Sequence, residues 1–500
     1  MHDVVIVGAG PVGLFLACEL GLAGRTVLVL EKDAEPRSPW KRAPLGTRGL
    51  SAASVEACYR RGMLAPVLEA AGLPYNPEGE PPPVRPHGHF AGMMIDPAKV
   101  DLAALPFQLP SPANQQAVVN LEAVETLLAE RAVELGVEIR RGTEVLAVTQ
   151  DAEGVVAHAN GEEHPARWLV GCDGGHSAVR KLTGFEFVGT GPRFTGYIAQ
   201  VELADQEKLK PWFNLTPTGM YLTMPGGGIG MMDFDGGTFD RSLPPTREHL
   251  QDVLRRVSGT DVTVTDVLLA STYTDRAMQT ATYRRGRVLM AGDAAHIHSP
   301  LGGQGLNTGL GDAVNLGWKL AAVLAGHARE ELLDTYELER HPIGAWVLEW
   351  TRAQVAAMGP DQHSQAAQAV LRDLIGTSDG ATYVYGKMSG AWLRYDVGDD
   401  HPLSGRGAPD FRLKDGLRLG ELMRDGQGVL LDLGLDQPLR AAAARWEGRV
   451  RYVAGAVEND LGLTAVLVRP DGVVAWAADG PVEVGEFERA AGRWFGTAAG

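Results

Sequence analysis

The segment at residues 291–309, AGDAAHIHSPLGGQGLNTG, places a carboxylate, two imidazoles and several glycines close together. It follows an apolar run at 288–290 and precedes a helical pattern at 312–320. Such residues could bind a metal, transfer a proton, or hold a phosphorylated cofactor in a glycine-rich turn. His296 and His298 alternate in an extended stretch, but no third ligand has a usable spacing, so we predict no metal site.

The N-terminus favours the cofactor. An apolar run at 4–7 precedes a G-x-G-x-x-G pattern and a helical period, and a second apolar run ends at an acid, Glu31. This order is typical of a dinucleotide site, in which glycines admit a pyrophosphate at a helix N-terminus and the acid binds an unphosphorylated ribose. The residues that we expect at the cofactor are Gly8, Gly10, Pro11, Val12, Gly13, Glu31 and Lys32.

A third segment at 166–180, ARWLVGCDGGHSAVR, repeats the pattern of an apolar run, an acid, glycines and a helix start. By itself it reads equally as an ordinary strand–turn–helix joint.

Taken in order, the three segments resemble the class A FAD-dependent aromatic monooxygenases, the family related to para-hydroxybenzoate hydroxylase. The motif GDAAH-x-H-x-P-x-GGQGLN-x-G-x-x-D-x-x-N-L-x-W-K-L is matched from Gly292 to Leu320, and 332–342 also resembles the family. The resemblance covers about the first 400 residues and is greatest to the branch that hydroxylates aromatic polyketides and antibiotics. Ser299 stands where the family usually has a proline.

The resemblance implies a bound FAD, reduced by NADPH or NADH, and O2 as the other substrate. It places Asp293 near the ribityl and pyrophosphate groups, and the backbone of Pro300 and Gly302 beside the reacting edge of the flavin. Arg42 and Arg48 would face the FAD phosphates or the flavin edge, and the residues do not show which takes which part. The remaining residues that it assigns to the cofactor are Asp173, Gly303, Gly305, Leu306 and Asn307.

The implied reaction is hydroxylation of a large aromatic molecule through a hydroperoxide at flavin C4a. The same chemistry would serve a Baeyer–Villiger or an antibiotic-inactivating oxygenation, which the residues do not separate. A non-catalytic flavin-binding protein is the rival from another class. A plain NAD dehydrogenase leaves the 291–309 segment unexplained, and a flavin halogenase would need a Trp-x-Trp motif, which the sequence lacks.

The expected fold is α/β: a Rossmann-like FAD-binding domain with an inserted mixed-sheet substrate domain and a thioredoxin-like C-terminal domain without CxxC. The predicted ranges are 1–186 with 274–395, then 187–273, then 396–500. Residues 74–89, rich in proline, are expected to form an exposed loop. Candidates for lining a substrate pocket are Tyr197, Met220, Leu222, Met224, Met231 and Phe234.

Composition limits the partners. With 46 Lys and Arg against 62 Asp and Glu, the net charge is -16, which argues against nucleic-acid binding. No apolar run reaches the roughly 18–20 residues of a membrane span, and no signal peptide is evident. Three cysteines make no disulfide framework. We expect a cytoplasmic monomer or homodimer whose partner is a large aromatic small molecule.

Overall fold

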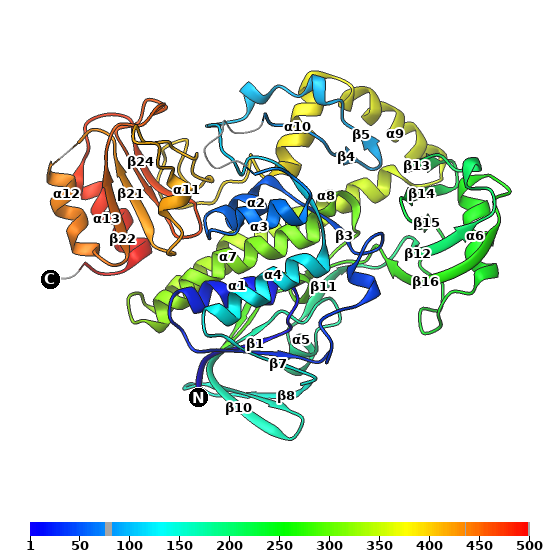
Figure 1. The fold of residues 1–500 in the computed structure, drawn as a ribbon, viewed down its shortest axis with the longest axis horizontal. Coiled ribbons are helices and arrows are strands. Elements are labelled where there is room, and N and C mark those ends of the chain that lie inside the picture. Colours follow the sequence, from blue (N-terminus) through cyan, green and yellow to red (C-terminus); the bar gives the residue numbers. More distant parts are fainter. Residues whose placement is uncertain (76–82, 436, 499–500) are drawn as a thin grey trace.

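The computed structural model describes residues 1–75, 83–435 and 437–498. Part of the predicted proline-rich loop, residues 76–82, therefore lies outside the described residues. The fold is the predicted α/β arrangement, with three main sheets (Figure 1). None of the described helices, including the 24-residue α8 (Asp334–Ala357), is long and apolar enough to cross a membrane.

The first sheet carries the N-terminal motif. Its path is β18-β19-β10-β1-β2-β7, with β9 on β10 and β8 on β9, and the central pairs are parallel. The side chains of Val4–Val7 are buried because parallel strands are covered on both faces. The strands are β1 (His2–Val7), β2 (Val27–Glu31), β7 (Glu138–Arg141), β8 (Val145–Gln150), β9 (Val155–Ala159), β10 (Glu162–Gly171), β18 (Arg284–Arg285) and β19 (Val288–Met290).

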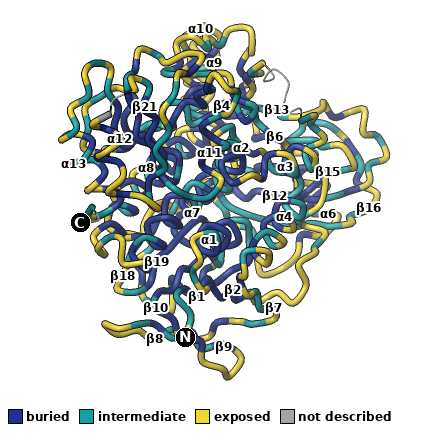
Figure 2. The backbone as a smooth tube through the Cα atoms, turned by 60° about the vertical axis from the view of Figure 1, so that its left-hand side comes forward, coloured by how far each residue is buried: buried dark blue, intermediate teal, exposed yellow. Residues whose placement is uncertain are grey.

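Three helices cover this sheet: α1 (Pro11–Leu22), α4 (Leu121–Glu134) and α7 (Gln304–Leu324), which run side by side in Figure 1. Helices α1 and α7 pack closely because glycines of α7 stand where other residues would collide. A Cβ at Gly309 would lie 2.6 Å from Val12, and one at Gly317 would lie 2.5 Å from the Cβ of Glu19. Figure 2 shows the chain around β1, β2 and α1 as buried.

The second sheet has the order β13-β14-β15-β12-β16, and α6 (Arg247–Ser258) packs on one of its faces. A hairpin turn over residues 225–228 joins β14 to β15, which are antiparallel neighbours. The strands are β12 (Thr195–Leu203), β13 (Trp212–Thr216), β14 (Gly219–Met224), β15 (Gly228–Asp233) and β16 (Val264–Thr274).

The predicted boundaries at 186/187 and 273/274 are crossed by a small sheet in which β17 lies between β11 and β20. Shorter elements complete the body around α8. They are β3 (Thr47–Leu50), β4 (His89–Phe90), β5 (Met93–Met94), β6 (Ala117–Asn120), β11 (Phe187–Thr190), β17 (Ala277–Thr280), β20 (His296–Ile297), α2 (Ala52–Tyr59), α3 (Leu64–Ala70), α5 (Ala178–Leu182), α9 (Gln362–Ile375) and α10 (Ser378–Ser389).

The C-terminal sheet has the order β22-β21-β23-β24, in which β21 and β22 are parallel and the other pairs antiparallel. With α12 (Gln437–Ala443) joining β21 to β22 and α13 (Val484–Phe495) at the end, this is the predicted thioredoxin-like topology. All three cysteines are buried free thiols in the body. The strands are β21 (Gly428–Asp432), β22 (Val450–Ala454), β23 (Ala465–Val468) and β24 (Val474–Ala478), and α11 (Leu419–Leu422) precedes them.

A buried ion network joins the C-terminal domain to the body. The guanidinium of Arg469, with no exposed surface, donates to both carboxylate oxygens of Glu339 at 2.6 and 2.9 Å. Glu339 also accepts from Lys319 at 2.8 Å, and Arg469 also pairs with Asp471. Burial alone would raise the pKa of Glu339, but Arg469 and Lys319 outweigh it and hold that pKa well below its usual value.

Replacing Arg469 tests how firmly the domains are joined. Arg469→Met leaves Glu339 and Asp471 buried with less compensation, so we expect a loss of about 3–5 kcal/mol in the free energy of unfolding, measured in urea. The control is Arg412→Met in the same domain, whose half-exposed ion pair with Glu458 should contribute less than about 1 kcal/mol. Equal losses in the two variants would refute this account.

Candidate active site

The glycines between β1 and α1 have different tasks. Gly8 has a φ of 106°, and a Cβ there would lie 2.4 Å from the carbonyl oxygen of Cys172. A Cβ at Gly13 would lie 2.1 Å from the carbonyl oxygen of Gly8. A Cβ at Gly10 would meet no atom within 4 Å. Gly8 and Gly13 therefore allow close packing, whereas Gly10 leaves open space before the N-terminus of α1.

Glu31 lies at the end of β2, beside the glycine turn. Its carboxylate accepts the backbone N–H of Ala9 at 2.8 Å and that of Asp33 at 2.9 Å. Lys32 instead points to solvent and pairs with Asp33 at 3.0 Å, so its predicted contact with the cofactor has no support from its position. The sequence order correctly placed an acid at the turn.

Asp173 follows β10 and is occupied by local structure. It accepts the backbone N–H of Ala178 at 2.7 Å and that of Val179 at 3.0 Å, together with the hydroxyl of Ser177. Asp173 thus caps α5, and a contact with a cofactor stays a prediction.

Several basic side chains lie near His176 in this turn. Burial lowers the pKa of His176, and the positive charges of Arg241, Lys181, Arg180 and Arg276 lower it further. Because the chain as a whole has a net charge of -16, this cluster of positive side chains is distinctive. It would attract the phosphates of a nucleotide.

Asp293, in the short turn after β19, differs from the other acids. Its residue surface is exposed, yet the protein around it raises the pKa of its carboxyl by desolvation, against the opposing charges of His296 and Arg48. The carboxylate therefore reaches the protein surface but is closely surrounded by protein atoms. Within the described residues nothing hydrogen-bonds to its carboxylate. Its Oδ1 lies 3.7 Å from the Cβ position of Gly305 at the start of α7.

The two arginines that could face the cofactor are now distinguished. Arg48 lies close enough to Asp293 for its charge to lower the pKa of that carboxyl. Arg42 points outward, where it pairs with Glu122 at 2.9 Å and is more than half exposed. The predicted role of Arg42 is therefore not favoured by its position, whereas the contact of Arg48 with a cofactor stays a prediction.

The turn before α7 contains two glycines in left-handed conformations. Gly302 has a φ of 77°, and Gly303, which precedes the helix, has a φ of 62° and provides no side-chain cap. The helix begins at Gln304. The carbonyl of Pro300 accepts the N–H of Gly303 at 3.1 Å, which closes this turn.

The side chain of Asn307 holds the turn in place, a role that the sequence did not indicate. It donates to the carbonyl of Gly49 at 2.9 Å and accepts the N–H of Ser51 at 2.8 Å and the hydroxyl of Ser54 at 2.7 Å. Asn307 therefore ties α7 to the segment between β3 and α2.

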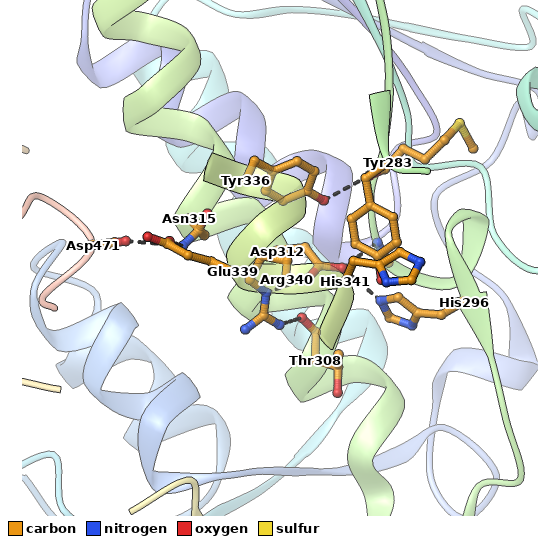
Figure 3. A network of polar contacts seen from close by, with 12 residues as sticks. Tyr283, His296, Thr308, Asp312, Asn315, Tyr336, Glu339, Arg340, His341 and Asp471 are labelled. Carbon is orange, nitrogen blue, oxygen red and sulfur yellow. Dashed lines mark hydrogen bonds and ion pairs between the residues drawn. The ribbon is translucent and has the colours of Figure 1, made fainter. Parts of the chain in front are cut away.

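A buried acid that we did not single out fixes the other side of the site. Asp312, with no exposed surface, accepts from the N–H of Gly292 at 3.0 Å, from His296 Nε2 at 2.8 Å and from Arg340 Nε at 2.7 Å (Figure 3). Burial would raise the pKa of Asp312, but Arg340 and His296 outweigh it and lower it. In the sequence, Asp312 was marked only by its position in the family motif.

His296 and His298, considered above as metal ligands, have other partners. His296 bonds to Asp312, and His298 Nδ1 lies 2.7 Å from the carbonyl oxygen of Ser299. Burial lowers the pKa of His298 to about 4, so this ring is neutral at pH 7. No three metal-binding side chains come together in the described ranges.

The predicted pocket residues divide between the two faces of the second sheet. Tyr197 and Met231 lie in the core against α6, where the Tyr197 hydroxyl bonds to His249 at 2.9 Å. This placement argues against a role for them in lining a pocket. Met220 and Phe234 belong to the other face, which packs toward Leu301. Leu222 and Met224 follow Met220 at intervals of two along β14 and share that face.

Two glycine variants test whether the turn at residues 8–13 binds the dinucleotide. Gly10→Ala adds a methyl to open space, with an ordinary φ of -77°, so the folded protein should keep its thermal midpoint but lose its dinucleotide at least tenfold more readily. Gly13→Ala collides with the Gly8 carbonyl and should lower the midpoint itself. Calorimetry and cofactor retention on gel filtration measure both. An unchanged cofactor affinity in Gly10→Ala would contradict this assignment.

Comparisons with known proteins agree with this geometry. The FAD binding domain family matches residues 1–351, and the C-terminal family of aromatic-ring hydroxylases matches residues 401–498. The chain is 40% identical, over its whole length and 99% of the relative, to the 12-dehydrotetracycline 5-monooxygenase/anhydrotetracycline 6-monooxygenase of Streptomyces rimosus. A rifampicin monooxygenase of Streptomyces venezuelae is also 40% identical, over 100% of this chain and 99% of that protein.

The solved structure of anhydrotetracycline hydroxylase from Streptomyces rimosus superimposes with a TM-score of 0.85, at 38% identity, and covers 100% of both chains. The match in sequence and in fold therefore extends over the whole chain. This chain belongs to the family of FAD-dependent aromatic-ring monooxygenases.

Proposed function

We propose that this protein uses FAD, NADPH or NADH, and O2 to hydroxylate a large aromatic molecule of the polyketide or antibiotic type. The observation that carries the proposal is that the glycine turn, the turn of Asp293 and the start of α7 meet at one place. Val12 lies 3.0 Å from the Cβ position of Gly292 and 2.6 Å from that of Gly309, and Asp293 Oδ1 lies 3.7 Å from that of Gly305. We call this place the proposed FAD site. We place the enzyme in the cytoplasm as a monomer or homodimer.

The residues around the proposed FAD site fit the parts of this cofactor. Open space before Gly10 admits a pyrophosphate, and Glu31 lies where a ribose hydroxyl would donate. Asp293, without a partner from the described chain, can accept ribityl hydroxyls. The uncapped N-terminus of α7 presents the positive end of its dipole to the N1 edge of the flavin.

When bound, FAD supplies the redox chemistry that takes hydride from the nicotinamide and activates oxygen. The chain's own contribution is to bind, orient and shield. Arg48 and the start of α7 place positive charge around the proposed FAD site. The basic group around His176 attracts the phosphates of the reduced nicotinamide nucleotide. Pro300 and Gly302 leave backbone, rather than a bulky side chain, beside the reacting edge.

The substrate is assigned to the face of the second sheet that carries Met220, Leu222, Met224 and Phe234. Flexible thioethers and an aromatic ring adapt to a broad, flat molecule. The substrate class is supported by the relatives, whose names refer to tetracycline and rifampicin. Baeyer–Villiger or antibiotic-inactivating oxygenation would use the same site and yields a different product.

An absorption spectrum followed by anaerobic NADPH addition tests the proposal. We expect a yellow protein whose flavin is bleached, faster in the presence of one member of a panel of polycyclic phenols. With 18O2, mass spectrometry should find one labelled oxygen atom in the product, and NMR separates a phenol from an ester. A colourless protein that takes up no FAD would refute the proposal, and flavin without NADPH oxidation would indicate the non-catalytic rival.

Neighbouring positions on β14 test the substrate face. Leu222→Trp should narrow the pocket and raise the KM of the aromatic substrate about tenfold or more, with flavin reduction by NADPH alone unchanged. Thr223→Trp is the matched control, since side chains alternate along a strand and Thr223 points to the opposite face. If both variants have the wild-type KM, the pocket lies elsewhere.

A further inference from the structure

A cavity of about 420 Å³ lies between the body and the C-terminal domain, and Met220, Leu222, Met224 and Phe234 are not among its lining residues. Its walls come from the start of α2, the first turns of α7, α8 and the end of α10, and from residues 405–410 and 471–473 of the C-terminal domain. We call it the interdomain chamber. Small-molecule sites measure about 300–1,000 Å³, so the chamber can hold a small organic ligand.

The chamber is rich in flat side chains. Five aromatic residues line it: Phe107, Trp346, Tyr385, Trp392 and Tyr395. Apolar contacts from Leu102 and Leu105 add to this wall. Aromatic rings give a conjugated ligand stacking and edge contacts, so this lining favours a flat, polycyclic molecule over a sugar or a peptide.

The carboxylates that line the chamber are already neutralised. Glu56 pairs with Arg60 at 2.8 Å, Asp410 pairs with Arg418 at 3.3 Å, and Asp471 pairs with the buried Arg469. Arg340 is a further lining cation, and its charge is matched by Asp312. These groups together leave little net charge on the walls.

Three other lining cations have no carboxylate partner within the described residues. The ammonium of Lys387 lies over the ring of Trp346, 5.4 Å from its centroid. Arg394 donates to the carbonyl of Ser404 at 3.0 Å, and Arg406 donates to that of Pro402 at 3.0 Å. The two guanidiniums are near enough for the charge of Arg394, after burial, to lower the pKa of Arg406.

The chamber also reaches the catalytic turn. Gln304 and Met388 line it. Gln304 Nε2 donates to the carbonyl of Gly302 at 3.1 Å, and Met388 lies 3.8 Å from the Cβ position of that glycine. A molecule in the chamber is therefore one side chain away from the turn that we assign to the flavin edge.

From these observations we propose that the interdomain chamber is a second binding site for a polycyclic aromatic molecule with a carboxylate or phenolate, held by Lys387, Arg394 and Arg406. Its occupant is the enzyme's own aromatic substrate or product, so the inference rests on the proposed function. The C-terminal domain, which has no redox cysteine, then has a task of its own: it supplies Arg406 and completes the wall.

The test uses the FAD-loaded full-length protein and anthraquinone-2-carboxylate as the probe. Equilibrium dialysis should find a site whose affinity falls about ten- to a hundredfold in the Lys387→Met/Arg406→Met double variant, as expected for the loss of charge-assisted contacts. Uncharged anthraquinone should lose less than threefold. Arg412→Met, in the same domain but outside the chamber, is the matched control and should bind as the wild type does.

A competition experiment identifies the occupant. NADP⁺ is also an aromatic anion, so displacement of the probe from this site by NADP⁺ at comparable concentration would overturn the proposal. An unchanged probe affinity in the double variant would also overturn it, even where FAD binding and NADPH oxidation are normal. Conversely, a protein without FAD or NADPH oxidation fails the proposed function, which makes the two failures distinguishable.

Discussion

The carboxylate of Asp312 is the contact on which the site depends. From the third turn of α7 it binds the N–H of Gly292, the ring of His296 and the guanidinium of Arg340. One buried charge therefore sets the position of the turn that carries Asp293 relative to the helix whose first turn we assign to the flavin edge. Because both neighbours of Asp312 are themselves buried, loss of this carboxylate would leave a guanidinium without its counter-charge in the core.

The sequence predicted what depends on local pattern. The glycine spacing at residues 8–13 and the acid at Glu31 follow from the geometry of one strand–turn–helix unit. Asp293 was assigned from the family motif that begins at Gly292. Each of these features is encoded within about 30 residues of sequence.

What could not be predicted depends on contacts across the chain. Arg42 and Arg48 look alike in sequence, and only the fold shows that one meets Glu122 and the other approaches Asp293. Met220 and Met231 both lie on strands with an alternating apolar pattern. That pattern does not show which face of the sheet packs against a helix. The pairing of Glu339 with Arg469 joins residues 130 positions apart.

The glycines of α7 have a further consequence. Gly309 and Gly317 fix the spacing to α1, and a Cβ at Gly311 would lie 2.9 Å from the guanidinium of Arg340, so α7 is held at backbone distance from two neighbours. Larger side chains at these three positions would push α7 away from α1 and α8 and displace the turn at Gly302 and Gly303. A change of substrate would then have to come from residues elsewhere, on the proposed substrate face of the second sheet and in the chamber walls.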